Sequence, residues 1–183
     1  IIFAIYSLSH SNNIKDLELK NKENDLKISD LENALNEVVS ETNELFNSYL
    51  KLLSKNLNFS HNERISVYKV YKNEFIMIGR ASESPNLKKP GRNKYPISDG
   101  FIGKGWDEGE FYINNLPDPD NRNGTSYYNA IIEHTKIAKE IVDSLKMKSR
   151  TYYVYRMDGF DNEPKALLVA ESKNEAAFTK ADI

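Results

Sequence analysis

The sequence predicts an α+β protein: an antiparallel sheet with flanking helices, preceded by a long N-terminal coiled-coil helix. Three observations predict this fold class. An apolar heptad repeat runs from Ile14 to Leu53, alternating apolar residues form hairpins at about 64–80 and 151–171, and an amphipathic segment separates the hairpins. A repeat of 3.5 residues held over several heptads is typical of a helix that packs on another helix.

The composition is that of a globular protein. Of the 183 residues, 39% are hydrophobic and 28% are charged, and the formal net charge is −2. This charge balance gives no bias toward nucleic acid, so we expect no nucleic-acid partner. The absence of cysteine excludes disulfides, thiolate catalysis and cysteine-based zinc sites. We expect neither a metal nor a cofactor.

Residues 1–9 are almost wholly apolar, but a membrane-spanning helix needs about 20 such residues. The run is therefore either the end of a transmembrane helix whose start is missing or an apolar extension of the coiled coil. We favour the first interpretation, because the run is apolar on every face and because Lys15, Lys20 and Lys22 follow it. It predicts a domain on the cytoplasmic face of the membrane, with the membrane as a partner through this apolar stub.

Residues 10–58 are expected to form one coiled-coil helix, which also acts as a lid on the following domain. Its first half favours a parallel homodimer, because Lys20 and Lys27 at g positions face Asp25 and Glu32 at e positions of a second copy. We assign to the dimer interface the a and d residues Ile14, Leu17, Ile28, Leu31, Leu35 and Val38.

From about residue 35 the e positions of this helix also become apolar, with Val39, Phe46 and Leu53. An apolar stripe this wide is typical of a helix that covers a globular core. The alternative to a dimer is therefore a monomeric helix folded back on its own domain.

The globular domain is expected at residues 59–183. Its expected elements, in order, are a strand 64–71, a tight turn at Lys72–Asn73, a strand 75–80, a long loop 81–99, a short helix within 100–110, a strand 111–113, a loop 114–125, a helix 126–147, strands 151–157 and 165–171, and the start of a truncated helix at 174–183. An antiparallel sheet with flanking helices fits this order.

Several motifs follow the opening hairpin. Gly100-Phe101-Ile102-Gly103-Lys104-Gly105-Trp106 is a glycine-bounded turn, and the strand Phe111–Ile113 leads into a loop with an Asp/Pro motif at 116–119. On these marks, residues 64–172 resemble a GAF domain, the PAS-like sensor fold. The resemblance implies a small-molecule site between the sheet and loops 81–99 and 114–125, with dimerisation through flanking helices. It does not extend to the tetrapyrrole branch, which needs a cysteine, or to the Asn-Lys-x-Asp-Glu pattern of the cyclic-nucleotide branch.

The candidate ligand-binding residues are Arg92, Tyr95, Phe101, Trp106 and Tyr112. The basic loop that holds Arg92 and Tyr95 could bind an anion through charge, guanidinium geometry and an aromatic surface, although a solvated loop is the simpler interpretation. Trp106 is either a core residue or a ligand platform. The glycine turn lacks the spacing of a phosphate-binding loop, and no nucleophile elbow or zinc-binding histidine pair occurs. We therefore expect no catalytic residue and no enzyme.

The sequence thus predicts a non-catalytic, GAF-like sensor or regulatory domain that binds a small molecule and signals through a parallel dimeric helix. Two alternatives remain: an interaction scaffold of the same fold without a ligand, and an extracytoplasmic sensor. A cavity of roughly 300 Å³ or more with convergent polar groups would favour sensing. A cavity filled by Phe101, Trp106 and Tyr112 would favour the scaffold.

Overall fold

A computed structural model describes residues 2–89, 94–135 and 137–183, with the backbone alone for residues 2–12 and 122–123. The chain divides into two compact units, Ile1–Glu44 and Leu45–Ile183. Helix α1 (Ile2–Asn56) forms the first unit and contributes its last turns to the second. The predicted long helix is confirmed.

Helix α1 ends in a hydrogen-bonded C-terminal cap. Asn58 adopts a positive φ of 54°, and the amides of Asn58 and Phe59 donate to the carbonyls of Lys55 and Ser54 at 2.9 Å. This pair of bonds is a Schellman motif, which turns the chain away from the helix axis. The Glu63 carboxylate then accepts bonds from the Ser60 amide and hydroxyl at 2.8 and 2.9 Å, so that Ser60–Glu63 forms a turn into the first strand.

The second unit is built on one antiparallel sheet, which has six strands among the described residues in the order β3-β2-β1-β6-β5-β4. The strands are β1 (Glu63–Tyr71), β2 (Glu74–Ala81), β3 (Lys94–Pro96), β4 (Glu110–Ile113), β5 (Thr151–Asp158) and β6 (Pro164–Ser172). Lys72 and Asn73, both with positive φ, make the tight turn between β1 and β2. The predicted α+β fold class is therefore confirmed.

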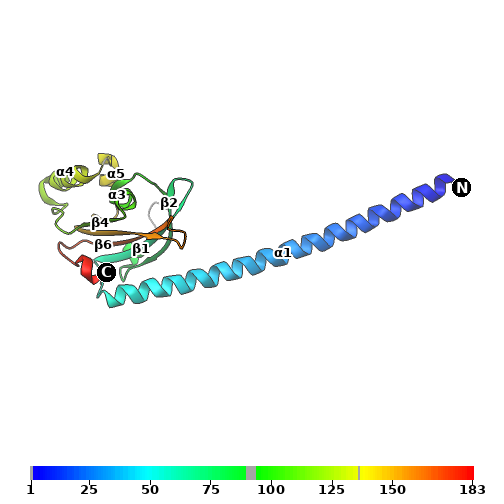
Figure 1. Cartoon of the computed structure of the whole chain (residues 1–183), viewed down its shortest axis with the longest axis horizontal. Coiled ribbons are helices and arrows are strands. Elements are labelled where there is room, and N and C mark those ends of the chain that lie inside the picture. Colours follow the sequence, from blue (N-terminus) through cyan, green and yellow to red (C-terminus); the bar gives the residue numbers. More distant parts are fainter. Residues whose placement is uncertain (1, 90–93, 136) are drawn as a thin grey trace. The chain divides into compact units, whose positions relative to one another are not determined.

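Helices cover one face of the sheet. Figure 1 shows α3 (Gly100–Glu108), α4 (Thr125–His134) and α5 (Lys139–Ser144) gathered on this face. The face holds a core of Phe75, Phe101, Ile131, Val154 and Leu167, and the main cavity described below. Gly105 lets α3 approach the sheet, because a Cβ there would lie 2.4 Å from Val154.

A second core lies on the opposite face of the sheet. Phe46 and Leu50, from the end of α1, pack there with Ile65 and Val67 of β1 and with Phe178 near the C-terminus. The wide apolar stripe predicted from residue 35 therefore reaches this core only from Phe46 on. Earlier members of the stripe are exposed in this chain, Leu35 by 63% and Val39 by 49%.

Three local expectations differ from the structure. The expected loop 81–99 contains α2 (Pro85–Lys88) and the edge strand β3. The expected helix 126–147 is divided into α4 and α5, because the backbone of Thr135 is extended and its hydroxyl bonds back to the Ile131 carbonyl. Residues 174–183 form only a 3-10 turn at Lys180–Asp182, because Phe178 is buried in the second core.

The predicted membrane anchor, and with it the predicted localisation, is wrong. None of the described helices is both long enough and apolar enough to cross a membrane. The apolar run at the start of α1 is short, and charged residues follow from Lys15 on within the same helix.

Candidate functional site

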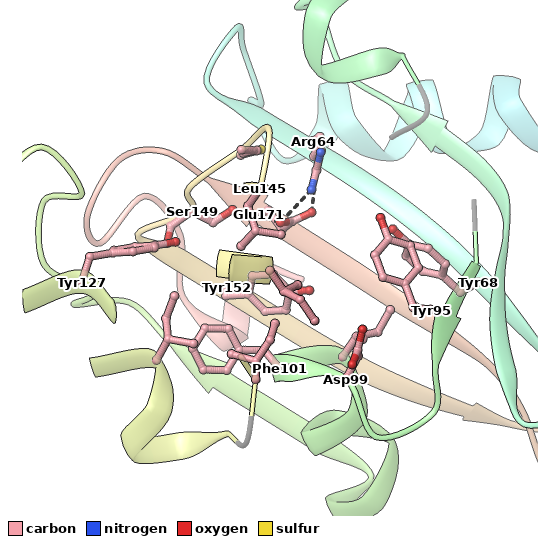
Figure 2. A pocket seen from close by; sticks show the side chains of 16 residues that line it. Arg64, Tyr68, Tyr95, Asp99, Phe101, Tyr127, Leu145, Ser149, Tyr152 and Glu171 are labelled. Atoms are coloured by element: carbon pink, nitrogen blue, oxygen red, sulfur yellow. Dashed lines mark hydrogen bonds and ion pairs between the residues drawn. The ribbon is translucent and has the colours of Figure 1, made fainter. Parts of the chain in front are cut away.

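The main cavity lies between the sheet and the helices of the covered face. It has a volume of about 90 Å³ and is lined by strands β1, β3, β5 and β6, by the start of α3, by α4, and by the segment between α4 and β5. Figure 2 shows its lining side chains, with Phe101 and Tyr127 on one side and Tyr68 and Tyr95 on the other. The cavity is thus aromatic with a few polar groups, the usual composition of a small-molecule site.

Three polar residues cross the sheet in one row at this cavity. Arg64 on β1 is the register partner of Glu171 on β6, and Glu171 is the partner of Tyr152 on β5. The Arg64 Nε and Nη2 atoms donate to the two carboxylate oxygens of Glu171 at 2.5 and 3.0 Å, the dashed pair in Figure 2. Both side chains are mostly buried, with 14% and 5% exposed. A two-bonded pair of this kind fixes both side chains at the cavity wall.

Burial and this ion pair set the charges at the cavity. Burial alone would lower the pKa of Arg64, but the charge and hydrogen bonds of Glu171 outweigh it and raise that pKa. Burial, followed by the charge of Glu171, raises the pKa of Tyr152 well above its ordinary value. Burial also raises the pKa of Tyr68 to about 12, with Arg80 acting in the opposite direction. At neutral pH the cavity therefore contains a charged pair and neutral phenols.

Two polar groups flank the pair and differ in their bonding. Ser149 donates to Glu171 at 2.9 Å, while its carbonyl accepts the hydroxyl of Tyr127 at 3.0 Å. The Tyr152 hydroxyl has no hydrogen-bond partner within the described ranges. The Tyr152 ring packs against the Phe101 ring, with ring centroids 5.2 Å apart. Tyr152 thus offers a donor and an acceptor to a molecule in the cavity.

The predicted ligand-binding residues lie in different parts of the structure. Tyr95 and Phe101 line the main cavity. Trp106 packs edge-on against Phe75 in the core, with ring centroids 5.7 Å apart. Tyr112 belongs to the second core and donates to the Phe178 carbonyl at 2.6 Å. Arg92 lies outside the described residues.

The cavity falls between the two outcomes that we set for sensing and scaffolding. Its volume of about 90 Å³ is below the roughly 300 Å³ expected of a sensing site. Of Phe101, Trp106 and Tyr112, which would fill the cavity in a scaffold, Phe101 alone lines it. Of the two predicted binding loops, the first contributes Tyr95 and Asp99, and the second contributes no lining residue from the described part of the chain.

Sequence reasoning missed Arg64, Glu171, Ser149 and Tyr152. A signal was present, because Arg64 and Glu171 occupy strand positions next to buried apolar residues, where a charge is uncommon. Their pairing could not be read from the sequence, because it depends on the register of two strands 107 residues apart.

No known protein-family model and no curated protein matches this sequence. Solved structures do resemble the fold. The type II free methionine-R-sulfoxide reductase of Thermoplasma acidophilum aligns with a TM-score of 0.52 and 11% identity, covering 79% of this chain and 83% of that chain. The free methionine-R-sulfoxide reductase of Neisseria meningitidis, solved in complex with its substrate, aligns with a TM-score of 0.52 and 15% identity. The alignment covers 80% of this chain and 73% of that chain.

GAF domains are also among the similar structures. The GAF domain of an Acinetobacter phosphoenolpyruvate-protein phosphotransferase gives a TM-score of 0.49 at 11% identity, covering 74% of this chain and 68% of that chain. Identities this low indicate a common fold and no more.

The expectation that the chain is not an enzyme is corrected by these comparisons. Two of the similar structures are reductases, so the fold also belongs to enzymes and does not exclude catalysis. The fold itself agrees with the sequence: the structure has the predicted antiparallel sheet with flanking helices, preceded by a long helix, and GAF domains are among its structural neighbours.

Proposed function

We propose that the chain is a sensory or regulatory protein whose second unit binds a free amino acid, or a zwitterion of similar size, in the main cavity. The observation that carries the proposal is the half-buried Tyr152 side chain, whose hydroxyl has no partner among the described residues and which lines the cavity beside a mostly buried ion pair. No buried side-chain polar atom of the described residues lacks a hydrogen bond, so this hydroxyl is open to the cavity, where a ligand can take the place of water as its partner.

The ion pair favours a zwitterionic ligand. Arg64 and Glu171 present opposite charges side by side at the cavity wall. An amino acid likewise carries one carboxylate and one ammonium group. The two similar reductases act, by name, on a free amino-acid derivative, which agrees with this ligand class. In this proposal the comparison supports only the class of ligand.

The small volume of the cavity requires a local movement. Ligand pockets usually measure roughly 300–1,000 Å³, against about 90 Å³ here. The side of the cavity formed by Ile137, Ile141, Leu145 and Met147 belongs to a segment whose only regular element is the six-residue α5. We expect this segment to shift outward when a ligand enters.

The test is a panel of free amino acids, methionine sulfoxide included, titrated by calorimetry into the wild type and Tyr152→Phe. A ligand that bonds to the Tyr152 hydroxyl should bind the variant roughly 5- to 10-fold more weakly, since a net hydrogen bond contributes about 1 kcal/mol. Tyr155→Phe, which alters an exposed tyrosine on the same strand, is the matched control. Binding to Tyr152→Phe at wild-type affinity, or no binding by any member of the panel, would contradict the proposal.

We further propose that α1 pairs with α1 of a second copy in parallel. The six predicted interface residues are all exposed in this chain, from 44% for Ile14 to 70% for Leu31. An exposed apolar stripe along a helix favours a partner that covers it. The g–e pairs of Lys20 with Asp25 and Lys27 with Glu32 form between two copies only when the helices run parallel and in register.

A single cysteine can test this pairing, because the chain has none of its own. Leu31→Cys places a thiol at a d position, where the thiols of a parallel pair meet, and should give a disulfide-linked dimer on mild oxidation. Asn33→Cys, at the outward f position, should stay monomeric on denaturing gels. Equal cross-linking of both variants, or none in either, would argue against the parallel pair.

A further inference from the structure

A second cavity adjoins the main one and contains an unusual charge. Its volume is about 170 Å³, and its lining includes Arg64, Arg80, Lys89 and Lys146 but no acidic side chain of the described residues. Five residues line both cavities and so stand between them: Arg64, Tyr95, Ile141, Leu145 and Met147.

Arg80 is a buried cation with no counter-ion among the described residues. Only 6% of it is exposed. Its guanidinium donates to the Ser66 hydroxyl at 2.8 Å, the Tyr68 hydroxyl at 2.9 Å and the Lys89 carbonyl at 3.3 Å, all of which are neutral acceptors. No carboxylate within the described ranges pairs with it. Arg64, by contrast, is neutralised by Glu171.

A buried charge of this kind is costly unless an opposite charge reaches it. The three acceptors hold the guanidinium in one orientation and use three of its five N–H groups. The remaining N–H groups can donate to a ligand, and the planar guanidinium matches the oxygen geometry of phosphate and carboxylate.

The rest of the lining adds positive charge. Lys89 and Lys146 are exposed side chains at the cavity, and neither forms an ion pair with a described carboxylate. With Arg64 already paired, the lining carries three positive charges, on Arg80, Lys89 and Lys146, that no described carboxylate compensates. This excess matches a dianion better than a single carboxylate.

We propose that the second cavity is a binding site for a phosphate group, with Arg80 as the buried anchor and Lys89 and Lys146 at its entrance. The group can be free phosphate or the phosphate of a small ester, which share the same dianionic oxygens. A cavity of about 150 Å³ accommodates benzene, so 170 Å³ has room for phosphate and a short organic group.

Calorimetry on the full chain tests the proposal, in a buffer free of phosphate and sulfate and with no amino acid present. Inorganic phosphate, glycerol phosphate and acetate are titrated separately. We expect phosphate to bind and acetate to bind at least roughly tenfold more weakly. A tighter affinity for the ester would identify an organic phosphate as the ligand, and equal affinities would identify the free ion.

Three variants assign the site. Arg80→Met should weaken phosphate binding roughly tenfold or more, since a charge-assisted hydrogen bond is lost with the charge. The double variant Lys89→Met with Lys146→Met changes only exposed side chains and should weaken binding severalfold even if Arg80→Met fails to fold. Lys69→Met removes an exposed lysine of β1 that lines neither cavity and should bind like the wild type.

Two results would overturn the proposal. One is the absence of phosphate binding by the wild type up to about 10 mM phosphate, because a dissociation constant above that concentration is too weak for a specific site. The other is unchanged binding in the double lysine variant, because the cations at the entrance would then play no part. Neither result would bear on the proposal of amino-acid binding in the main cavity, because the amino-acid titrations contain no phosphate.

Discussion

A single residue, Tyr68, connects the two cavities. Its ring lines the main cavity, and its hydroxyl accepts a bond from Arg80, which lines the second. The groups that act on its ionisation are Arg80, Tyr95, Glu171 and Arg64. Burial outweighs the favourable charges of the two arginines, so the phenol stays protonated in the folded chain.

The raised pKa of Tyr68 predicts a loss of stability at high pH. The unfolded chain releases this proton near pH 10, while the folded chain holds it until about pH 12. The stabilising contribution is therefore complete below pH 10 and decreases as the pH rises toward 12. Tyr68→Phe should flatten the dependence of the unfolding free energy on pH in this window, as measured by urea denaturation. A slope as steep as that of the wild type would show that Tyr68 does not titrate as described, and Tyr155→Phe provides the control.

Local signals predicted the residues of the site only in part. Tyr95 and Phe101 could be found because they belong to a basic loop and a glycine-bounded turn. Trp106 and Tyr112 have the same aromatic character but point into cores, and nothing in the local sequence separates a core aromatic from a cavity aromatic. The ion pair of Arg64 with Glu171 needed the register of β1 against β6.

Among the elements, the contact between α1 and β2 depends on one glycine. A Cβ on Gly79 would lie 2.5 Å from the Phe46 Cε1 atom and 2.8 Å from the Leu50 Cδ1 atom. These distances are too short for non-bonded carbons, so the absence of a side chain at position 79 permits the last turns of α1 to pack on the sheet.

Gly79→Ala should therefore destabilise the second unit by about 1–3 kcal/mol, the usual range for overpacking a core. The expected readout is a lower midpoint in urea denaturation. The destabilisation caused by Gly79→Ala should be smaller in a chain that already carries Phe46→Ala, because that change removes the ring that the new Cβ would contact. Gly159→Ala should cost little, since its Cβ would meet mainly the mobile ends of Asp161 and Lys165. Equal losses at both glycines would contradict this account.

The hairpins and the long helix were predictable because their signals are local. Alternating β-branched and aromatic residues specify β1, β5 and β6, and a heptad specifies α1. The division between α4 and α5 was not predictable, because Thr135 lies in an amphipathic pattern that continues on both sides. Strand β3 was missed because its three residues are too few for an alternating pattern.

For the whole molecule, the two compact units imply separable roles. The second unit has cores on both faces of its sheet and includes the α1 turns from Leu45 on. Residues up to Glu44 carry most of the exposed apolar residues of α1. Folding of the domain and self-association should therefore depend on different parts of the chain.

Deletion of residues 1–44 should leave a domain that unfolds cooperatively at nearly the same temperature but sediments as a monomer. The full chain should sediment as a dimer at the same concentration. Circular dichroism melting and analytical ultracentrifugation measure the two properties separately. A truncated chain that fails to unfold cooperatively, or that still dimerises, would contradict the separation of roles.

Gly79 and Arg80 are consecutive residues of β2, and consecutive strand residues face opposite sides of a sheet. Gly79 contacts Phe46 and Leu50 of α1, while Arg80 lines the second cavity. If an anion binds at Arg80 as proposed, a tilt of β2 that brings Arg80 closer to the anion would move Gly79 away from α1. Because such coupling is reciprocal, an event that presses α1 harder onto the sheet should in turn weaken the hold of Arg80 on its ligand.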